Sequence, residues 1–321
     1  YNIKSLLITG GTGFFGKSII TWLNNNPGGF SEIIILSRHP NRLSQLFSTK
    51  DLAFKVSFIK QDIVNPLKYE GSVDYIIHAA SESSSFAYIE NPIQMRNVII
   101  SGTQNVLEYA NKIGAKRVLF ISSGAVYGKQ PADMTYIPED YEGAPDPLNY
   151  LNSYGCAKRQ AENLCALYNH HYNVDYVVAR CFAFVGPYLS LDSHFAIANF
   201  IRDGLKGGPV VVNDDGSPYR SYLYADDLTE WLWTILLKGK SGEAYNVGSD
   251  EAITIKELAY KVSDCFNSNP EVVIKQKLEP GRAPERYVPC IKKVKSNLSL
   301  SVRKPLTQAI DETIRYHSSS F

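Results

Sequence analysis

A run of glycines directly after a short apolar segment constrains the fold of this 321-residue chain more than any other feature. Ser5–Thr9 has the pattern of a buried strand, and it runs straight into Thr9-Gly10-Gly11-Thr12-Gly13-Phe14-Phe15-Gly16, followed by a helix predicted over Gly16–Asn24. Glycine permits the tight turn and lets backbone N–H groups approach an anion, while the helix directs its positive end at the same point. The strand, turn and helix together predict a cradle for the pyrophosphate of a dinucleotide.

The first 180 residues alternate short β-branched runs with longer helical patterns. Strands that are apolar at nearly every position are buried on both faces, as in a parallel sheet between helices. We therefore predict an α/β fold with a doubly wound parallel sheet (a Rossmann fold) and a smaller C-terminal substrate-binding lobe. The other expected strands are Glu32–Leu36, Val56–Ile59, Tyr75–His78, Val118–Ser122 and Asp175–Ala179, and the expected long helices are Gln94–Ile113 and Ser153–His170.

The rhythm of the sequence changes after Gly186-Pro187. We predict an NAD(P)-binding Rossmann domain over residues 1–186 and a substrate-binding lobe over residues 187–321, with segments such as 221–248 returning to the first domain. Helices in this second part are expected near Phe195–Gly204, Asp226–Leu237, Ile255–Phe266 and Leu306–Tyr316.

Composition excludes several classes of protein. Lys and Arg number 33 against 32 Asp and Glu, and this balance argues against a nucleic-acid binder, which carries a basic excess. No stretch reaches the roughly 20 apolar residues of a membrane span, and the start of the chain lacks a signal-peptide pattern. The five cysteines show no C-x-x-C spacing, which predicts no structural metal and a reducing, cytoplasmic location.

The end of the second expected strand bears on the choice of cofactor. An Asp or Glu there would bind the 2′-hydroxyl of NAD, but the chain has Ser37-Arg38, and a hydroxyl with a guanidinium suits the 2′-phosphate of NADP. NADP is therefore favoured and NAD remains the alternative, in which Arg38 stacks on adenine or faces solvent. Asp62, after the third strand, is placed either to contact the adenine or to cap its own loop.

A possible catalytic group begins the helix predicted from Ser153. Tyr154 and Lys158 are four residues apart and share one helix face. A nearby ammonium favours the phenolate, so such a tyrosine suits proton transfer at a carbinol or carbonyl. Ser122 and Ser123 end the fifth strand, at the sheet edge where open α/β folds bind ligands. A tyrosine–lysine pair by itself is usually structural, and the serines make the catalytic interpretation the stronger one.

These motifs together resemble the extended short-chain dehydrogenase/reductase family, and more narrowly its NAD(P)-dependent epimerase/dehydratase group, which acts on nucleotide sugars. The resemblance covers nearly the whole chain. It is carried by the glycine turn, Asp62, His78-Ala79-Ala80, Asn97, Ser123, Tyr154-Gly155-x-x-Lys158-x-x-Ala161-Glu162, Arg180, Gly186-Pro187, Asp215-Gly216, Arg220-x-x-x-Tyr224-x-x-Asp227 and Tyr245-Asn246-Val247-Gly248.

The resemblance implies roles for the matching residues. Ser123, Tyr154 and Lys158 would form a catalytic triad in which Tyr154 is the acid/base and Lys158 also holds the nicotinamide ribose, while hydride passes between nicotinamide C4 and a sugar carbon. The implied cofactor-binding residues are Gly10, Gly13, Phe14, Phe15, Gly16, Ser37, Arg38, Asp62, Ile63, Ala79, Ala80, Asn97, Ser122, Tyr154 and Lys158. The implied substrate-binding residues are Ser81, Ser123, Ala183, Arg220 and Arg282, the two arginines holding the diphosphate.

The family also implies an assembly and a pathway. Relatives form a homodimer through a four-helix interface, for which Gln94–Ile113 and Ser153–His170 are the candidate helices, although their apolar positions could equally pack within one subunit. A monomer in light scattering at micromolar concentration would refute the dimer. The expected pathway is bacterial surface-polysaccharide synthesis, with a nucleotide-diphosphate sugar as substrate and no nucleic-acid or membrane partner.

Two departures from the family pattern separate the possible reactions. The 4,6-dehydratases carry an Asp-Glu pair after the catalytic hydroxyl residue, where this chain has Gly124 and Ala125. That difference disfavours a dehydratase, and also a decarboxylase that needs an acid at the second position. Ala183 replaces an Asn found in many relatives, which indicates an altered sugar pocket.

Two readings of the reaction are strong: NADPH-dependent reduction of a 4-keto-6-deoxy nucleotide sugar, which Ser37-Arg38 favours, and epimerisation, for example at C4, with a retained NAD. A non-catalytic NADP(H)-binding regulator is disfavoured, because such proteins lose the tyrosine–lysine pair. A reductase for a small hydrophobic ketone is disfavoured by the two arginines. His78 is expected to be a packing residue, and His194, in the loop 188–194, is a weaker candidate for substrate contact.

Overall fold

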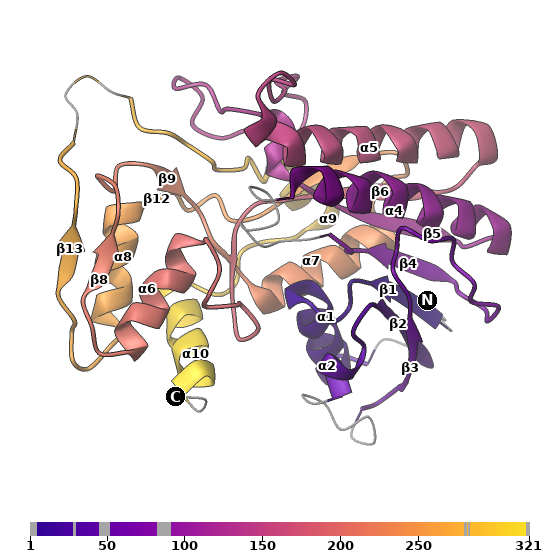
Figure 1. Cartoon of the computed structure of the whole chain (residues 1–321), viewed down its shortest axis with the longest axis horizontal. Helices are drawn as coiled ribbons and strands as arrows, with labels where there is room; N and C mark the ends of the chain where they lie inside the picture. Colours follow the sequence, from indigo (N-terminus) through magenta and orange to yellow (C-terminus); the bar gives the residue numbers. More distant parts are fainter. Residues whose placement is uncertain are drawn as a thin grey trace. The chain divides into compact units, whose positions relative to one another are not determined.

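The computed structural model describes residues 5–27, 30–44, 52–81, 91–278, 281 and 283–318 (Figure 1). The chain divides into two compact units, each built from three segments. Unit 1 comprises Tyr1–Gly128, Ala144–Arg180 and Thr229–Tyr245, and unit 2 comprises Lys129–Gly143, Cys181–Leu228 and Asn246–Phe321. The division into domains at residue 186 stays a prediction.

A seven-stranded sheet forms the centre of the fold, in the order β11-β6-β5-β4-β1-β2-β3. The pairs β1/β2, β1/β4, β2/β3 and β4/β5 are all parallel, which confirms the predicted fold class. The chain builds one side of the sheet with β2 and β3, then returns to the other side of β1 with β4. Ligands bind open α/β sheets where the order reverses, here beyond the ends of β1 and β4. The strands are β1 (Ser5–Thr9), β2 (Glu32–Ser37), β3 (Lys55–Lys60), β4 (Tyr75–His78), β5 (Arg117–Ser123), β6 (Tyr176–Cys181) and β11 (Ala244–Val247).

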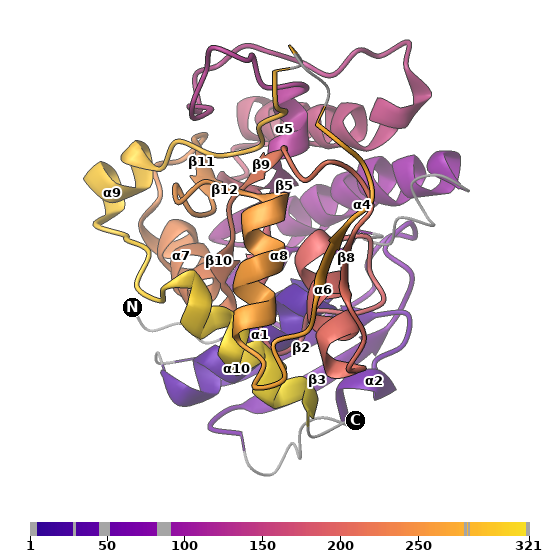
Figure 2. The same cartoon turned by 90° about the vertical axis from the view of Figure 1, so that its left-hand side faces the viewer.

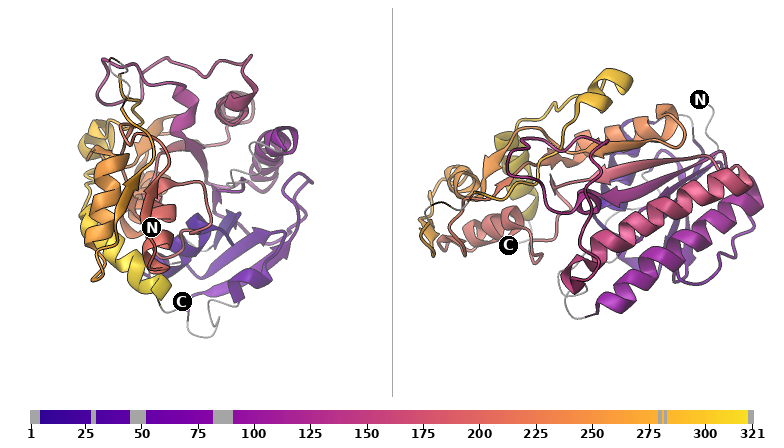
Figure 3. Two further views of the ribbon diagram at one scale, coloured as in Figure 1. Left: turned by 60° about the vertical axis from the view of Figure 1, so that its left-hand side comes forward. Right: turned by 90° about the horizontal axis from the view of Figure 1, so that it is seen from above.

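The sheet is covered on both faces. Helices α4 (Pro92–Ile113) and α5 (Ser153–Tyr172) lie side by side along one face, as both views of Figure 3 show. Leu7 of β1 belongs to the apolar core under these helices. Its neighbour Leu6 points to the opposite face of the sheet and is equally buried, although it lies outside that cluster. Burial on both faces is the reason that the strands are apolar at nearly every position.

Helix α1 (Phe14–Asn25) follows the glycine turn as predicted, and α7 (Ala225–Lys238) corresponds to the helix expected near Asp226–Leu237. Three short elements carry residues that matter below: α2 (Asn41–Ser44), and the 3-10 turns η2 (Gly124–Tyr127) and η3 (Tyr150–Asn152). Among the described residues, no helix is both long and apolar enough to cross a membrane.

Unit 2 groups α6 (Ala196–Leu205), α8 (Ile255–Asp264) and α10 (Leu306–Ser318), which Figure 2 shows beside one another. Its strands have only two or three residues, too few for periodicity to reveal them, and the sequence analysis missed them together with α9 (Lys292–Leu298). The strand pairs are β8 (Val210–Val212) with β13 (Val272–Ile274), β9 (Tyr219–Arg220) with β12 (Ile253–Thr254), and β7 (Phe184–Val185) with β10 (Leu223–Tyr224).

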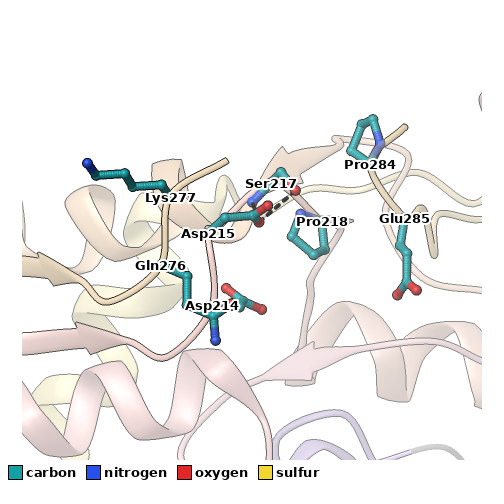
Figure 4. Close-up of a pocket in the computed structure, with 8 residues that line it drawn as sticks. All are labelled: Asp214, Asp215, Ser217, Pro218, Gln276, Lys277, Pro284 and Glu285. Atoms are coloured by element: carbon teal, nitrogen blue, oxygen red, sulfur yellow. Dashed lines mark hydrogen bonds between the residues drawn. The ribbon is translucent and has the colours of Figure 1, made fainter. Parts of the chain in front are cut away.

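A hollow in unit 2 is lined largely by acidic and polar side chains, including Asp214, Asp215 and Glu285 (Figure 4). Two of these carboxylates stabilise the turn at residues 214–217 through hydrogen bonds. Asp214 accepts the N–H of Gly216 at 2.9 Å, and Asp215 accepts the N–H and the hydroxyl of Ser217 at 2.8 and 2.7 Å. None of the described residues that line the hollow is a predicted site residue. Within the described ranges, no group of three or more His, Cys, Asp or Glu side chains could hold a metal ion.

Candidate active site

The glycine turn forms a backbone-lined cradle between the ends of β1 and β4. Gly10 has φ +70°, and a Cβ there would lie 2.8 Å from the Cα of Ala80. A Cβ on Gly16 would lie 2.2 Å from the Cα of Gly11, so the start of α1 can press against the turn only without a side chain. The Gly13 N–H donates to the Gly10 carbonyl at 3.1 Å and closes the turn. This cradle suits a pyrophosphate, because a side chain at either glycine would occupy space that the backbone needs.

A pocket extends from this turn along the ends of β2, β3 and β4. It gathers many of the predicted cofactor residues with Ser81, a predicted substrate residue, and it adds others that the sequence analysis missed. The predicted lining residues are Gly10, Gly13, Ser37, Arg38, Asp62, Ile63, Ala80 and Ser81, and the missed ones are Thr12, Leu36, His39, Arg42, Gln61 and Val98.

Other predicted cofactor residues lie around this pocket without lining it. Phe14, Phe15 and Gly16 form the first turn of α1, and Ala79 precedes the lining residue Ala80. Asn97 is exposed on α4, one position before the lining residue Val98. A dinucleotide fits this arrangement, since the cradle and the pocket are continuous through Gly10 and Gly13.

Ser37 and Asp62 both have structural tasks in the pocket wall. The buried Ser37 hydroxyl pairs with the Thr12 hydroxyl at 2.9 Å and accepts the N–H of His39 at 3.1 Å, which ties the glycine turn to the end of β2. Asp62 accepts the N–H of Val64 at 3.2 Å while it also lines the pocket. Asp62 therefore caps its own loop, and its contact with adenine stays a prediction.

The three predicted catalytic residues belong to α5 and to the end of β5, both in unit 1. Lys158 is 3% exposed, and its ammonium donates to the Ile121 carbonyl at 2.8 Å. The same ammonium lies 5.8 Å from the centre of the Tyr154 ring. The Ser123 hydroxyl accepts the N–H of Ala125 at 3.2 Å and caps η2. A hydroxyl, a phenol and an ammonium thus lie on two elements that pack together.

The turn after Ser123 approaches the start of α5 very closely. A Cβ on Gly155 would lie 2.5 Å from the Ala125 carbonyl oxygen, so the residue that follows Tyr154 must be small. Neither Gly124 nor Ala125 carries a titratable side chain. The predicted triad therefore provides a hydroxyl, a phenol and an ammonium for proton transfer near this turn. The η2 turn itself adds no carboxyl group.

Two arginines of unit 2, Arg220 and Arg286, lie on backbone segments that pair although they are far apart in sequence. Arg220 in β9 lies 6.0 Å from the Tyr287 ring centre, and the Arg286 guanidinium lies 4.0 Å from the centre of the Tyr219 ring. The backbone bridge between Tyr219 and Arg286 pairs the two segments, and each arginine packs on a tyrosine of the other segment. Arg286 was not predicted as a site residue, because no local pattern in the sequence marks it.

The other predicted substrate residues in this part of the chain are Arg282 and Ala183. Arg282 lies outside the described residues. The carbonyl of Ala183 accepts the Leu223 N–H at 3.0 Å, so its backbone helps to pair β7 with β10.

His78 at the end of β4 is a buried structural residue. Its Nδ1 lies 2.7 Å from the Thr9 hydroxyl, and its Nε2 lies 3.1 Å from the Thr103 hydroxyl. Because Thr103 donates to the Ile99 carbonyl, it accepts from Nε2–H, which assigns a neutral ring whose Nδ1 accepts from Thr9. Burial, and secondarily the charge on Lys158, lowers the pKa of His78 from 6.5 to about 3.

This buried imidazole predicts a loss of stability in acid. The pKa of His78 is lower in the folded state than in the unfolded state. Below about pH 6.5, His78 therefore binds a proton in the unfolded chain but stays neutral in the folded chain. The free energy of unfolding should fall by up to about 1.4 kcal/mol for each pH unit below that value. Urea unfolding at a series of pH values should show a shallower decline for His78→Gln. Equal slopes for the variant and the wild type would contradict the assignment.

Comparison with known proteins agrees with this geometry. The sequence profile of the NAD dependent epimerase/dehydratase family matches residues 6–248. The chain is 30% identical over 313 residues to UDP-glucuronic acid decarboxylase 6 of Arabidopsis thaliana, covering 95% of this chain and 86% of that protein. It is 29% identical over 323 residues to UDP-glucuronic acid decarboxylase 1 of Danio rerio, covering 98% and 73%.

Solved structures match over nearly the full length. The UDP-glucose 4-epimerase of Thermotoga maritima superposes with a TM-score of 0.82 at 23% identity and covers 98% of this chain and 99% of its own. The dTDP-glucose 4,6-dehydratase of Streptomyces venezuelae, with NAD bound, gives 0.83 at 24% identity and covers 98% and 97%. These likenesses show the fold. Because the family profile spans most of the chain and its glycine cradle is present, the chain belongs to the NAD dependent epimerase/dehydratase family of nucleotide-sugar-modifying enzymes.

Proposed function

We propose that this protein uses NADPH to reduce the 4-keto group of a 4-keto-6-deoxy nucleotide sugar. The observation that carries the proposal is the cationic rim of the pocket after β2, formed by Arg38 and Arg42. The segment from Ser37 to Ser44 contains no Asp or Glu that would bind a ribose 2′-hydroxyl. A phosphorylated cofactor suits such a rim, and within this family NADPH is the usual reductant that is consumed and released.

The charge around this rim also favours a bound anion. Arg38 and Arg42 are exposed, and each offers a guanidinium that binds phosphate by charge-assisted hydrogen bonds. Burial and the neighbouring Arg42 guanidinium hold the pKa of Lys17 on α1 below its usual range. The positive charges of Lys17 and Arg42 therefore repel each other, and a bound 2′-phosphate would reduce this repulsion.

The rim predicts a specific loss of NADPH affinity. Charged hydrogen bonds are worth about 1.5–3 kcal/mol each, so Arg38→Ala/Arg42→Ala should weaken NADPH binding about 100-fold or more and leave NADH binding unchanged. Fluorescence titration with both cofactors measures this difference. Arg96→Ala is the matched control, because Arg96 is an exposed arginine on α4 that does not line the pocket. An equal loss of affinity for both cofactors would contradict a 2′-phosphate site.

The predicted triad provides the proton chemistry of a ketone reduction. The nicotinamide of a bound cofactor would supply the hydride. We assign the Tyr154 phenol to donate a proton to the carbonyl oxygen and the Ser123 hydroxyl to bind that oxygen, which stabilises the developing alkoxide. The buried Lys158 ammonium favours the phenolate that remains after proton transfer.

The residues after Ser123 argue against the reactions named for several relatives. The two sequence relatives described above are UDP-glucuronic acid decarboxylases, and one structural relative is a 4,6-dehydratase. Gly124 and Ala125 provide no acid for eliminating water or for assisting loss of carboxylate, whereas reduction of a ketone needs one proton and one hydride. We assign Arg220, with Arg282, to the diphosphate of the substrate, because a guanidinium binds phosphate oxygens through two parallel hydrogen bonds.

The deciding experiment incubates the purified protein and NADPH with a panel of 4-keto-6-deoxy sugar nucleotides that differ in base. Stoichiometric loss of NADPH absorbance, with formation of the alcohol, is the expected result. Interconversion of ordinary UDP-hexoses without loss of NADPH, by protein that holds NAD tightly, would show an epimerase instead. Release of CO₂ from UDP-glucuronic acid would show a decarboxylase, and either outcome overturns the proposal.

A further inference from the structure

We propose that Glu162, through its ion pair with Arg180, is a positioning residue that fixes the register of α5 against the end of β5. This inference rests on the proposed function, because it takes Tyr154, Lys158 and Ser123 as the groups that must be aligned. All the residues concerned belong to unit 1.

Glu162 joins α5 to two strands. One of its carboxylate oxygens accepts the Ser122 hydroxyl at 2.6 Å and Nε of Arg180 at 3.1 Å, and the other accepts Nη2 of Arg180 at 2.8 Å. Arg180 also donates from Nη1 to the Tyr127 hydroxyl at 3.0 Å, with its guanidinium 4.8 Å from the centre of that ring. Ser122 and Tyr127 lie on either side of Ser123 in the chain, so this network holds both ends of the segment that carries the Ser123 hydroxyl.

Glu162 is also in register with the predicted catalytic residues of its own helix. Tyr154, Lys158 and Glu162 follow one another at intervals of four, which places them on one helix face. Lys158 contacts the Ile121 carbonyl, and Glu162, one turn further on, contacts Ser122.

The start of α5 makes the complementary contacts with η2. Gly155 packs against the Ala125 carbonyl, and the Arg159 guanidinium donates to the Val126 carbonyl at 3.0 Å. A slip of α5 by one helical turn would move Tyr154 by about 5.4 Å, far outside hydrogen-bonding reach of an aligned carbonyl. Among these contacts, only that between Glu162 and Arg180 joins two oppositely charged side chains, whereas the others are made to backbone carbonyls or hydroxyls.

The chemistry of this pair suits positioning more than stability. The side chains of Glu162 and Arg180 are 14% and 16% exposed. A buried ion pair contributes little net stability relative to apolar residues, but its bidentate geometry tolerates little displacement. Substitution of either Glu162 or Arg180 should therefore shift α5 relative to β5 and also lower the stability of the fold.

A matched pair of variants separates positioning from stability. Arg117 and Asp175 form a second partly buried ion pair, at 2.7 Å, at the opposite ends of β5 and β6 from Ser123. Both Glu162→Gln and Asp175→Asn should lower the melting temperature. Because a misplacement of about 1 Å can cost about 100-fold in rate, Glu162→Gln should lower kcat by about 10- to 100-fold while the KM for NADPH stays nearly constant. Asp175→Asn should retain the wild-type kcat.

Hydrogen exchange gives a readout that needs no substrate. Peptides covering residues 121–128 should lose protection in Glu162→Gln and keep it in Asp175→Asn, when both are compared at equal distance below their melting temperatures. If Glu162→Gln fails to fold, Tyr127→Phe removes the bond that Arg180 donates to the Tyr127 hydroxyl without leaving a charge unpaired, and it should lower kcat several-fold.

Two outcomes would overturn the inference. One is a Glu162→Gln variant with wild-type kcat and unchanged protection of residues 121–128. The other is an Asp175→Asn variant that loses as much kcat as Glu162→Gln. If instead the wild-type protein turns over no member of the substrate panel, the proposed function fails, while hydrogen exchange still tests the positioning role.

Discussion

Tyr154→Phe is expected to lower kcat by about 1000-fold or more, while the protein stays folded and binds its cofactor. General acid–base catalysis by a positioned side chain contributes about 100- to 10,000-fold, and the substitution removes the phenolic proton that we assign to the reaction. The ring that packs near Lys158 is retained, so the apolar contacts of the start of α5 remain. The measurement is kcat with the substrate identified from the panel, together with a melting curve.

Tyr168→Phe is the control for this prediction. Tyr168 lies on the same helix, where its hydroxyl donates to Glu108 at 3.2 Å, and it has no part in the proposed chemistry. Its variant should keep kcat within about twofold of the wild type, since it removes one side-chain hydrogen bond of modest net value. Full activity in Tyr154→Phe would remove the acid/base assignment, whatever the reaction is.

Gly10→Ala is expected to abolish dinucleotide binding at micromolar cofactor concentrations. The new methyl group would lie 2.8 Å from the Ala80 Cα and 2.9 Å from its nitrogen, so the end of β1 and the loop after β4 must separate. The residue would also hold φ +70°, which costs about 1–2 kcal/mol for a residue with a Cβ. Displacement of this backbone removes the N–H groups that the cradle presents, and the dissociation constant for NADPH should rise about 100-fold or more.

Gly207 provides a matched control, because it has the same φ of +70° but nothing lies within 4 Å of the position that a methyl group would take there. Gly207→Ala should therefore lose a comparable amount of stability from backbone strain while it keeps its affinity for NADPH. Calorimetry of cofactor binding and thermal unfolding of both variants separate the two effects. Unimpaired binding in Gly10→Ala would show that the turn does not cradle the pyrophosphate.

Local pattern was sufficient to predict most of the sheet. Ser5–Thr9 and Tyr75–His78 were predicted with the bounds that the structure shows, and Val118–Ser122 falls one residue short at each end. These strands were predictable because burial on both faces leaves a continuous apolar run. In unit 2, β9 has two residues, and a segment of that length has no periodicity to detect.

The predicted site was recoverable where its residues follow the ends of strands. The glycine turn, Ser37-Arg38, Asp62 and Ala80 line one pocket because parallel strands end at the same edge of the sheet. The assignments of individual residues to catalysis and binding remain predictions for the experiments above.

The amino-acid sequence by itself determined the positions and burial of most strands of the large sheet, the glycine cradle and the spacing of Tyr154 and Lys158, because each depends on neighbours within a few residues. Only the tertiary structure brought Arg42 to the rim of the pocket, Arg286 beside Tyr219, and Glu162 into contact with Ser122 and Arg180. Such contacts join segments that are distant in the chain, and the order of the strands and the packing of helices decide which distant residues meet.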